Sequence, residues 1–250
     1  MKPEQADNSE TGGAISVRVW RGDAAGGDYE EFTIPDRPNQ TILDAVTEIQ
    51  RDHDPSLSYR FACRVGMCGS CAMMVNGKPR WTCRTLVETV AGPSRRLTLA
   101  PLRNLPVIKD LAADMTVFFE KWGKAMGRFD DGGAPDPDFA PVDPASKDRQ
   151  DVDSAIECIN CGVCYAACDT VTWDEDYLGP AALNRAWSLI KDEKDKGRVD
   201  RLRAVSRKGG CLSCHTHQRC ADLCPNLLNP TRSIAGLKRA VMVSTLKGEL

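Results

Sequence analysis

Apolar and polar residues alternate near the start of the chain, and this two-residue period is typical of a half-buried strand. Ile15, Val17 and Val19 are the apolar positions of this first strand. The polar, glycine-containing run 22–28 predicts a turn, and residues 29–34 are expected to return as a second strand. The chain is therefore predicted to begin with an antiparallel hairpin.

A capped helix and a second hairpin are predicted next. Thr41 and Asp44 have the spacing of a capping box, so we expect a helix to begin there. The dipeptide Asn76-Gly77 predicts a tight turn between strands at 71–75 and 80–83. The apolar face of the helix is formed by Ile42, Ala45, Val46 and Ile49.

The second half of the chain changes to helical spacing. Apolar residues recur at helical intervals over 107–122, and helices are also expected over 180–196 and 200–207. The run 130–150 is rich in Gly, Pro and Asp, which predicts a surface loop. Pro230 has the position of a helix start, and the apolar face of this last helix holds Ile234, Leu237 and Val241.

Composition limits the function classes. The chain has 250 residues, of which 42% are hydrophobic and 27% charged, as in an ordinary globular protein. A formal net charge of −2 provides no global positive field, so we expect no nucleic-acid partner. The sequence contains no apolar run of about 18 residues, and MKPEQADNSE has no apolar core typical of a signal peptide. We therefore expect synthesis in a reducing compartment and no membrane span.

Twelve cysteines fall into three groups, at 63–83, 158–168 and 211–224. Disulfides are rare in a reducing compartment, and cysteines three residues apart are poorly placed to pair. Isolated buried thiols would not cluster in this way. Clustered thiolates bind soft metals, which leaves zinc or iron–sulfur clusters.

The spacing of the first group favours iron and sulfide. A C-x4-C-x2-C run with a fourth cysteine eleven residues further on is the plant-type ferredoxin pattern for a [2Fe–2S] cluster. Gly66 and Gly69 lie between the ligands, where they allow the backbone to wrap the cluster and direct its amides at it. The candidate ligands are Cys63, Cys68, Cys71 and Cys83.

The second and third groups are related to each other. The second has the bacterial ferredoxin spacing C-x2-C-x2-C-x3-C, and the third repeats it before Pro225 with His217 at the second ligand position. In such a duplicated motif each last cysteine serves the other cluster. A [4Fe–4S] cluster is then predicted on Cys158, Cys161, Cys164 and Cys224. A [3Fe–4S] cluster is predicted, unless His217 coordinates as well, on Cys168, Cys214 and Cys220.

Cys211 is left without a partner in these patterns. It is interpreted as a buried thiol, and the other possibility is a further ligand. With His215 or His217 it would supply the mixed thiolate and imidazole ligands of a Rieske-type centre, if an anchor subunit contributed the rest.

Together the elements and the cluster motifs predict an α+β fold. Residues 1–13 are expected to form a mobile tail, and 14–105 a β-grasp [2Fe–2S] ferredoxin-like domain. Residues 106–250 are expected to form an all-α domain that carries the duplicated bacterial-ferredoxin-type motif. No nucleophile–base pair or phosphate loop accompanies the clusters, so the chain is predicted to move electrons and to perform no bond chemistry itself.

The cysteine motifs resemble those of the iron–sulfur subunits of succinate dehydrogenase and fumarate reductase. The stretches that carry the resemblance are CRVGMCGSCAMMVNGKPRWTC, LPVIKDLAADMTVFF, CINCGVCYAACD and CHTHQRCADLCP. The resemblance implies a flavoprotein subunit that oxidises succinate or reduces fumarate at FAD. It further implies electron transfer through [2Fe–2S], [4Fe–4S] and [3Fe–4S] clusters to a quinone at a membrane-anchor subunit. The chain would then be a peripheral protein, held by the anchor on the cytoplasmic face of the inner membrane.

The resemblance also implies quinone-side residues beside the third cluster. The matching positions are His215, Trp173 and Thr170. Many relatives have proline after the ligand that matches Cys168, whereas this chain has Asp169, which predicts a rebuilt quinone rim. Two other functions stay open at this point: an iron–sulfur adaptor of another membrane-associated dehydrogenase, and a zinc-stabilised binding module.

Overall fold

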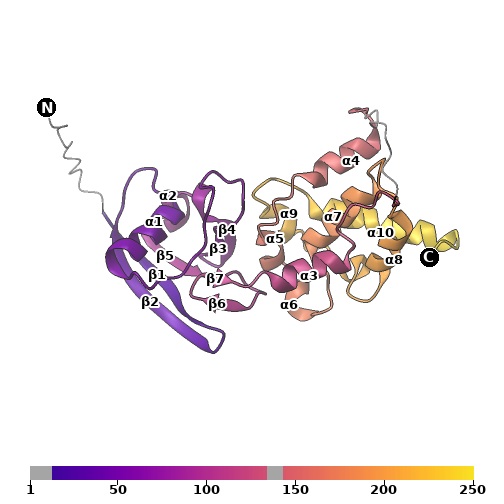
Figure 1. The fold of residues 1–250 in the computed structure, drawn as a ribbon. Coiled ribbons are helices and arrows are strands. Elements are labelled where there is room, and N and C mark those ends of the chain that lie inside the picture. Colours follow the sequence, from indigo (N-terminus) through magenta and orange to yellow (C-terminus); the bar gives the residue numbers. More distant parts are fainter. Residues whose placement is uncertain (1–12, 134–142) are drawn as a thin grey trace.

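The computed structural model describes residues 13–133 and 143–250 of the chain. A sheet-containing half comes first and a helical half second, and the two lie side by side (Figure 1). This arrangement confirms the predicted α+β class. Of the predicted tail, residues 1–12 lie outside the described residues.

The sheet half is built on five strands in the order β2-β1-β5-β3-β4. β1 pairs antiparallel with β2 and parallel with β5, while β3 pairs antiparallel with both β5 and β4. The first turn is tighter than predicted, since β1 continues to Asp23 and β2 begins at Gly26. The strands are β1 (Ala14–Asp23), β2 (Gly26–Pro35), β3 (Ala72–Val75), β4 (Lys78–Trp81) and β5 (Arg96–Ala100).

Helix α1 (Ile42–Glu48) has the predicted capping box, because Thr41 accepts from the Asp44 amide and the Asp44 carboxylate accepts from the Thr41 amide. A π-helical turn over Ile49–His53 continues it, and α2 (Val87–Ala91) precedes β5. The predicted apolar face of α1 packs with the alternate residues of β1 into one buried core. The local prediction for this part of the chain is confirmed.

The helix predicted over 107–122 is wrong. The chain instead forms the short hairpin β6 (Val107–Lys109) and β7 (Ala112–Ala113), and helix α3 begins only at Thr116 and ends at Lys124. The Asp114 carboxylate accepts from the Thr116 amide and so stabilises this later start. Leu111 packs in the core of the sheet half, whereas Phe118 packs in the core of the helical half. The two side chains therefore do not lie on the apolar face of a single helix.

Asp110 in the β6–β7 turn holds three segments of the sheet half together. Its side chain is 3% exposed and accepts from the amides of Gly22 (3.1 Å) and Ser58 (2.8 Å). Nε of Arg21 lies 3.1 Å from the same carboxylate. A buried charge with several donors is costly to remove, since each donor is then left unpaired.

We expect Asp110→Asn to lower the free energy of unfolding by about 2 kcal/mol. The neutral amide replaces a carboxylate that accepts hydrogen bonds from several groups, and its NH2 group cannot accept from them. Glu30→Gln is the matched control: Glu30 pairs with the same Arg21 but is 52% exposed, so its loss should cost less than about 1 kcal/mol. Urea unfolding of the cluster-loaded chain measures both. Equal losses for the two variants would contradict the assigned role of Asp110.

The helical half packs around α7 (Pro180–Ile190), whose residues are nearly all buried. Helix α10 (Pro230–Leu246) begins at the predicted proline and lies against α7, with Gly236 directly beside the ring of Trp187. α7 ends at Ile190 instead of 196, and α8 follows. The remaining helices are α4 (Lys147–Ile156), α5 (Val163–Ala166), α6 (Asp169–Trp173), α8 (Arg198–Ser206) and α9 (Arg219–Asp222).

The loop predicted over 130–150 is partly wrong. Ser146 accepts from the Arg149 amide and caps α4, which begins at Lys147, while residues 134–142 lie outside the described residues. No helix in the described parts of the chain has the length and apolar character needed to cross a bilayer.

Candidate iron–sulfur sites

The first thiol group lies at one edge of the sheet half. Cys63 and Cys68 belong to the loop after the π-helical turn, Cys71 directly precedes β3, and Cys83 lies in a 3-10 turn after β4. The β3–β4 hairpin brings Cys71 and Cys83 together, with the Cys83 amide 3.5 Å from the Cys71 sulfur. The Cys68 amide donates to the Cys63 sulfur, and Cys63 lies near Cys83, so the structure brings together the four residues that the spacing predicts.

The loop that carries Cys63 wraps the site with backbone N–H groups. The Cys63 sulfur accepts from the amides of Met67 (3.2 Å) and Cys68 (3.3 Å). The amides of Val65, Met67 and Cys68 lower the pKa of Cys63 to about 6, whereas burial raises the pKa of Cys83 to about 11. Gly66 and Gly69 have positive φ angles, which allow the tight turns of this loop.

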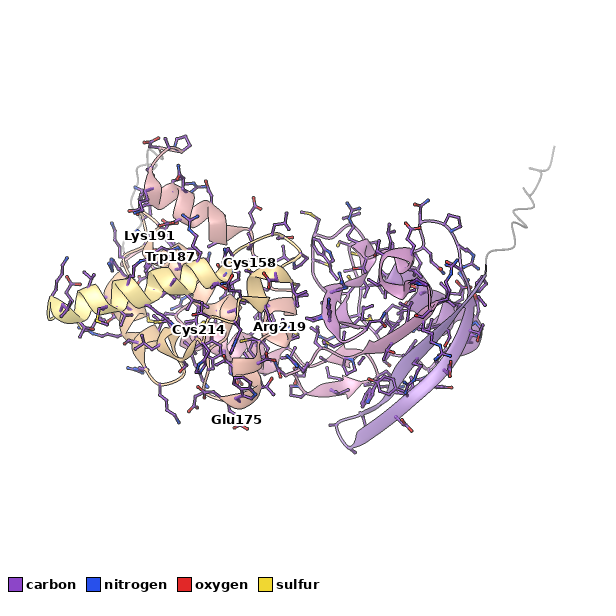
Figure 2. The ribbon with its side chains drawn as sticks, turned by 180° about the vertical axis from the view of Figure 1, so that it is seen from behind. Cys158, Glu175, Trp187, Lys191, Cys214 and Arg219 are labelled. Carbon is purple, nitrogen blue, oxygen red and sulfur yellow. The ribbon has the colours of Figure 1, made fainter. Side chains whose placement is uncertain are left out.

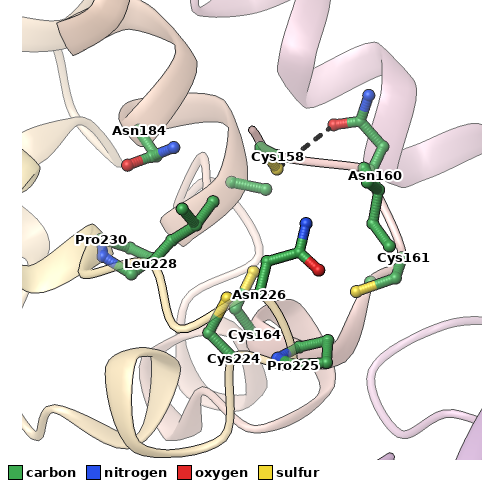
Figure 3. A pocket seen from close by; sticks show the side chains of 13 residues that line it. Cys158, Asn160, Cys161, Cys164, Asn184, Cys224, Pro225, Asn226, Leu228 and Pro230 are labelled. Carbon is green, nitrogen blue, oxygen red and sulfur yellow. Dashed lines mark hydrogen bonds between the residues drawn. The ribbon is translucent and has the colours of Figure 1, made fainter. Parts of the chain in front are cut away.

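The second group lines an apolar cavity in the helical half (Figure 3), and Figure 2 shows Cys158 of this group there. Three thiols come from the loop before α5 and from α5 itself, and the fourth follows α9. Pro225 and Leu228 complete one wall, and Asn184 lies at another, where it donates to the Ala155 carbonyl. The cavity therefore unites the residues of the predicted [4Fe–4S] set: Cys158, Cys161, Cys164 and Cys224.

The third group lines a neighbouring cavity. Two of its thiols have polar partners in place: the Thr216 amide donates to the Cys214 sulfur at 3.4 Å, and the Thr231 hydroxyl lies 3.3 Å from the Cys220 sulfur. Other residues around it are Thr170, Tyr177 and His217. The three thiols of the predicted [3Fe–4S] set meet here: Cys168, Cys214 and Cys220.

Three of the predicted residues do not line the third cavity, namely Cys211, His215 and Trp173. Cys211 is fully buried in the apolar core of the helical half, and burial raises the pKa of its thiol to about 11. It lines neither cavity. The ring of His215 stacks on that of His217 at 6.0 Å, and Trp173 meets His217 edge-on at 5.9 Å. The two histidines and Trp173, which is 67% exposed, therefore form one aromatic group at the rim of the cavity.

The chemistry of the three sites fits iron–sulfur clusters. Their walls combine thiols with backbone amides and hydroxyls, and these N–H and O–H groups can donate hydrogen bonds to cluster sulfur. Burial raises the pKa of Cys161 to about 12 and that of Cys220 to about 11, so cluster insertion there must release protons. The buried Tyr177 hydroxyl lines the third site and has no hydrogen-bond partner among the described residues, so an acceptor such as cluster sulfur fits there.

The sites are joined by close contacts. A Cβ on Gly69, in the first loop, would lie 2.5 Å from Cβ and 2.7 Å from Cα of Cys161 in the second. The second and third sites also adjoin. Burial raises the pKa of Cys164 most, and the charges of nearby thiols, including that of Cys220 in the third site, raise it further. The three sites therefore form a continuous series from the sheet half into the helical half.

Two residues after β5 hold the halves together, and sequence reasoning missed both. Arg103 pairs with Asp169 at 2.9 Å and donates to the Ala166 carbonyl. Asn104 donates to the carbonyls of Tyr165 and Cys168 and accepts from the Thr172 hydroxyl. Asp169 thus has a partner in the sheet half. No local pattern indicates either contact, because each joins residues more than 60 positions apart.

Comparison with known proteins agrees with these sites. A family described as a 2Fe-2S iron–sulfur cluster binding domain matches residues 16–120, and one described as a 4Fe-4S dicluster domain matches residues 157–229. These matches confirm the expected [2Fe–2S] and [4Fe–4S] clusters.

Individual relatives cover most of the chain. The mitochondrial succinate dehydrogenase (ubiquinone) iron-sulfur subunit 1 of Oryza sativa subsp. japonica is 35% identical over 199 residues, which are 79% of this chain and 70% of the relative. The fumarate reductase iron-sulfur subunit of Haemophilus influenzae is 34% identical over 215 residues, 81% of this chain and 82% of the relative. A chain in the solved structure of the Mycobacterium smegmatis Sdh1 complex in the apo form has a TM-score of 0.80 and 29% identity, with 91% of this chain and 95% of that chain covered. The predicted resemblance is thereby confirmed: the chain belongs to the family of iron–sulfur subunits of succinate dehydrogenase and fumarate reductase, and it is an electron-transfer subunit.

Proposed function

We propose that this chain relays electrons between the FAD of a flavoprotein subunit, where succinate is oxidised or fumarate reduced, and a quinone at a membrane-anchor subunit. The observation that carries the proposal is the unbroken series of three thiol-lined sites, joined where Gly69 meets Cys161 and where Cys164 adjoins Cys220. When bound, the clusters supply one-electron redox chemistry. The protein holds them in a fixed order and at short separations.

Each site has its own set of ligands in this proposal. The [2Fe–2S] cluster is held by Cys63, Cys68, Cys71 and Cys83 of the sheet half. The [4Fe–4S] cluster is held by Cys158, Cys161, Cys164 and Cys224, and the [3Fe–4S] cluster by Cys168, Cys214 and Cys220. His217 lines the third cavity beside these thiols and is the only imidazole among its described lining residues.

The two ends of the series suit different partners. Near the first site Val65 and Met67 are 58% and 69% exposed, and this apolar rim supports contact with the flavoprotein subunit. At the other end we place the quinone beside Trp173 and His215, which meet His217 at the rim of the third cavity. Thr170 is buried and lines this cavity together with Cys168, which supports a role beside the third cluster. We further propose that the anchor subunit holds the chain on the cytoplasmic face of the inner membrane.

Reconstitution with the flavoprotein subunit tests this function. We expect succinate to bleach the visible absorption of the clusters in the two-subunit complex, and a membrane-anchor subunit to add quinone reduction. The control is the chain without the flavoprotein, whose absorption succinate should leave unchanged. If succinate reduced the flavin and left the clusters oxidised, the chain would serve another dehydrogenase and the proposal would be wrong.

A further inference from the structure

Tyr177 has a buried hydroxyl that nothing in the described parts of the chain satisfies. Its side chain is fully buried, and its hydroxyl makes no hydrogen bond of good geometry in the described residues, although the Cys214 thiol lies beside it. An unpaired hydroxyl in the interior costs about 1–3 kcal/mol, so native proteins seldom retain one without a reason. The hydroxyl therefore indicates an acceptor that belongs to the site it faces.

That site is the third cavity, which Tyr177 lines together with Cys168, Cys214 and Cys220. The thiols of Cys214 and Cys168 lie close to the phenol. A phenol O–H can donate to negatively charged sulfur, which such a site supplies.

The backbone on either side of Tyr177 is held firmly. Its amide donates to the Asp174 carbonyl, and the following amide, that of Leu178, donates to the Gly209 carbonyl at 2.7 Å. Gly209 lies so close to Asp176 that a Cβ on it would be 2.1 Å from the Asp176 carbonyl oxygen. The ring is thus fixed between α6 and α7 and has little freedom to turn its hydroxyl elsewhere.

We propose that the Tyr177 hydroxyl donates an O–H···S hydrogen bond to the [3Fe–4S] cluster and thereby raises its reduction potential. The physical reason is that the reduced cluster carries more negative charge, so a donor stabilises it more than the oxidised cluster. This proposal rests on the proposed ligand set of the third site. It assigns to Tyr177 the task of keeping the last cluster of the series a good electron acceptor.

A redox titration of the assembled complex, followed by EPR, tests the proposal. We expect Tyr177→Phe to lower the equilibrium constant for reduction of the third cluster by about tenfold, which is about 59 mV for a one-electron couple. The midpoints of the other two clusters should stay unchanged. The matched control is Tyr165→Phe, because Tyr165 is the other buried tyrosine of the helical half and does not line the cavity.

A second measurement has an arm on the wild-type chain, which does not require the Tyr177 variant to retain its cluster. Fluorotyrosine is a stronger hydrogen-bond donor, and only four tyrosines are present in the chain. Its incorporation should raise the third midpoint in the wild-type chain and in Tyr165→Phe, and have no effect in Tyr177→Phe. If neither Tyr177→Phe nor fluorotyrosine shifted the midpoint potential of the third cluster, the proposed role of Tyr177 would be wrong, and the proposed ligand set would stand. A wild-type complex without any [3Fe–4S] signal would contradict the proposed ligand set, and the Tyr177 proposal with it.

Discussion

Replacing Cys224 with alanine is expected to abolish the [4Fe–4S] cluster and to leave the [2Fe–2S] cluster intact. Cys224 is the last cysteine of the third group in sequence, yet it lines the second cavity with Cys158, Cys161 and Cys164. Loss of one of four thiolates leaves an iron without its ligand in an apolar cavity that offers no substitute. EPR and visible spectra of the anaerobically purified complex measure the cluster content.

Three matched variants separate this ligand set from its neighbours. Cys220→Ala should remove the [3Fe–4S] signal, because Cys220 lines the third cavity although it lies only four residues before Cys224. Cys211→Ala should retain all three clusters, because its thiol lines neither cavity. His217→Ala should leave the [3Fe–4S] signal in place. Loss of the third cluster in Cys224→Ala, with the [4Fe–4S] cluster intact, would show that the proposed exchange of last cysteines is wrong.

Gly69→Ala is expected to slow electron transfer between the first two clusters several-fold. The new Cβ would lie 2.5–2.7 Å from Cβ and Cα of Cys161, where ordinary contact needs at least 3.4 Å. Because one of these atoms is backbone, the two cluster-binding loops must move apart by the difference, roughly 1 Å. Electron tunnelling falls exponentially with distance, so a separation of this size is enough to be measured. Rapid mixing of the assembled complex with succinate, followed by EPR at each cluster, gives the rates.

Gly77→Ala is the matched control. Gly77 has a φ of 74°, close to the 70° of Gly69, but a Cβ on it meets nothing within 4 Å. Both variants therefore carry the same backbone strain, about 1 kcal/mol, and only Gly69→Ala separates the loops. We expect Gly77→Ala to transfer electrons at the wild-type rate. Equal rates in both variants, with all clusters present, would contradict the Gly69–Cys161 contact as the junction of the relay.

Local signals in the sequence account for much of the fold. Thr41 and Asp44 form a capping box, Asn76-Gly77 forms a hairpin turn and Pro230 begins a helix, because each signal acts within a few residues. Ser146 is the cap of α4 and could have indicated its start. The helix is otherwise so polar that only Val152 and Ala155 are buried apolar residues, and two positions do not show a helical period.

The failures have a common physical cause, which is tertiary contact. The apolar spacing over 107–122 matches a helix, yet Leu111 and Phe118 serve different cores, and the buried Asp110 carboxylate stabilises a turn between them. The grouping of the thiols was predictable because cluster geometry imposes spacing on the sequence. Asn104 and Tyr177 were not predictable, because their roles depend on packing between segments far apart in the chain.

The central claim is that the thiols hold three inorganic clusters of different type in one series. Analysis of iron and acid-labile sulfide, combined with Mössbauer spectra of the anaerobically purified chain, tests this claim most directly. The expected result is one [2Fe–2S], one [4Fe–4S] and one [3Fe–4S] cluster per polypeptide. A colourless chain that binds zinc and contains no labile sulfide would contradict the account.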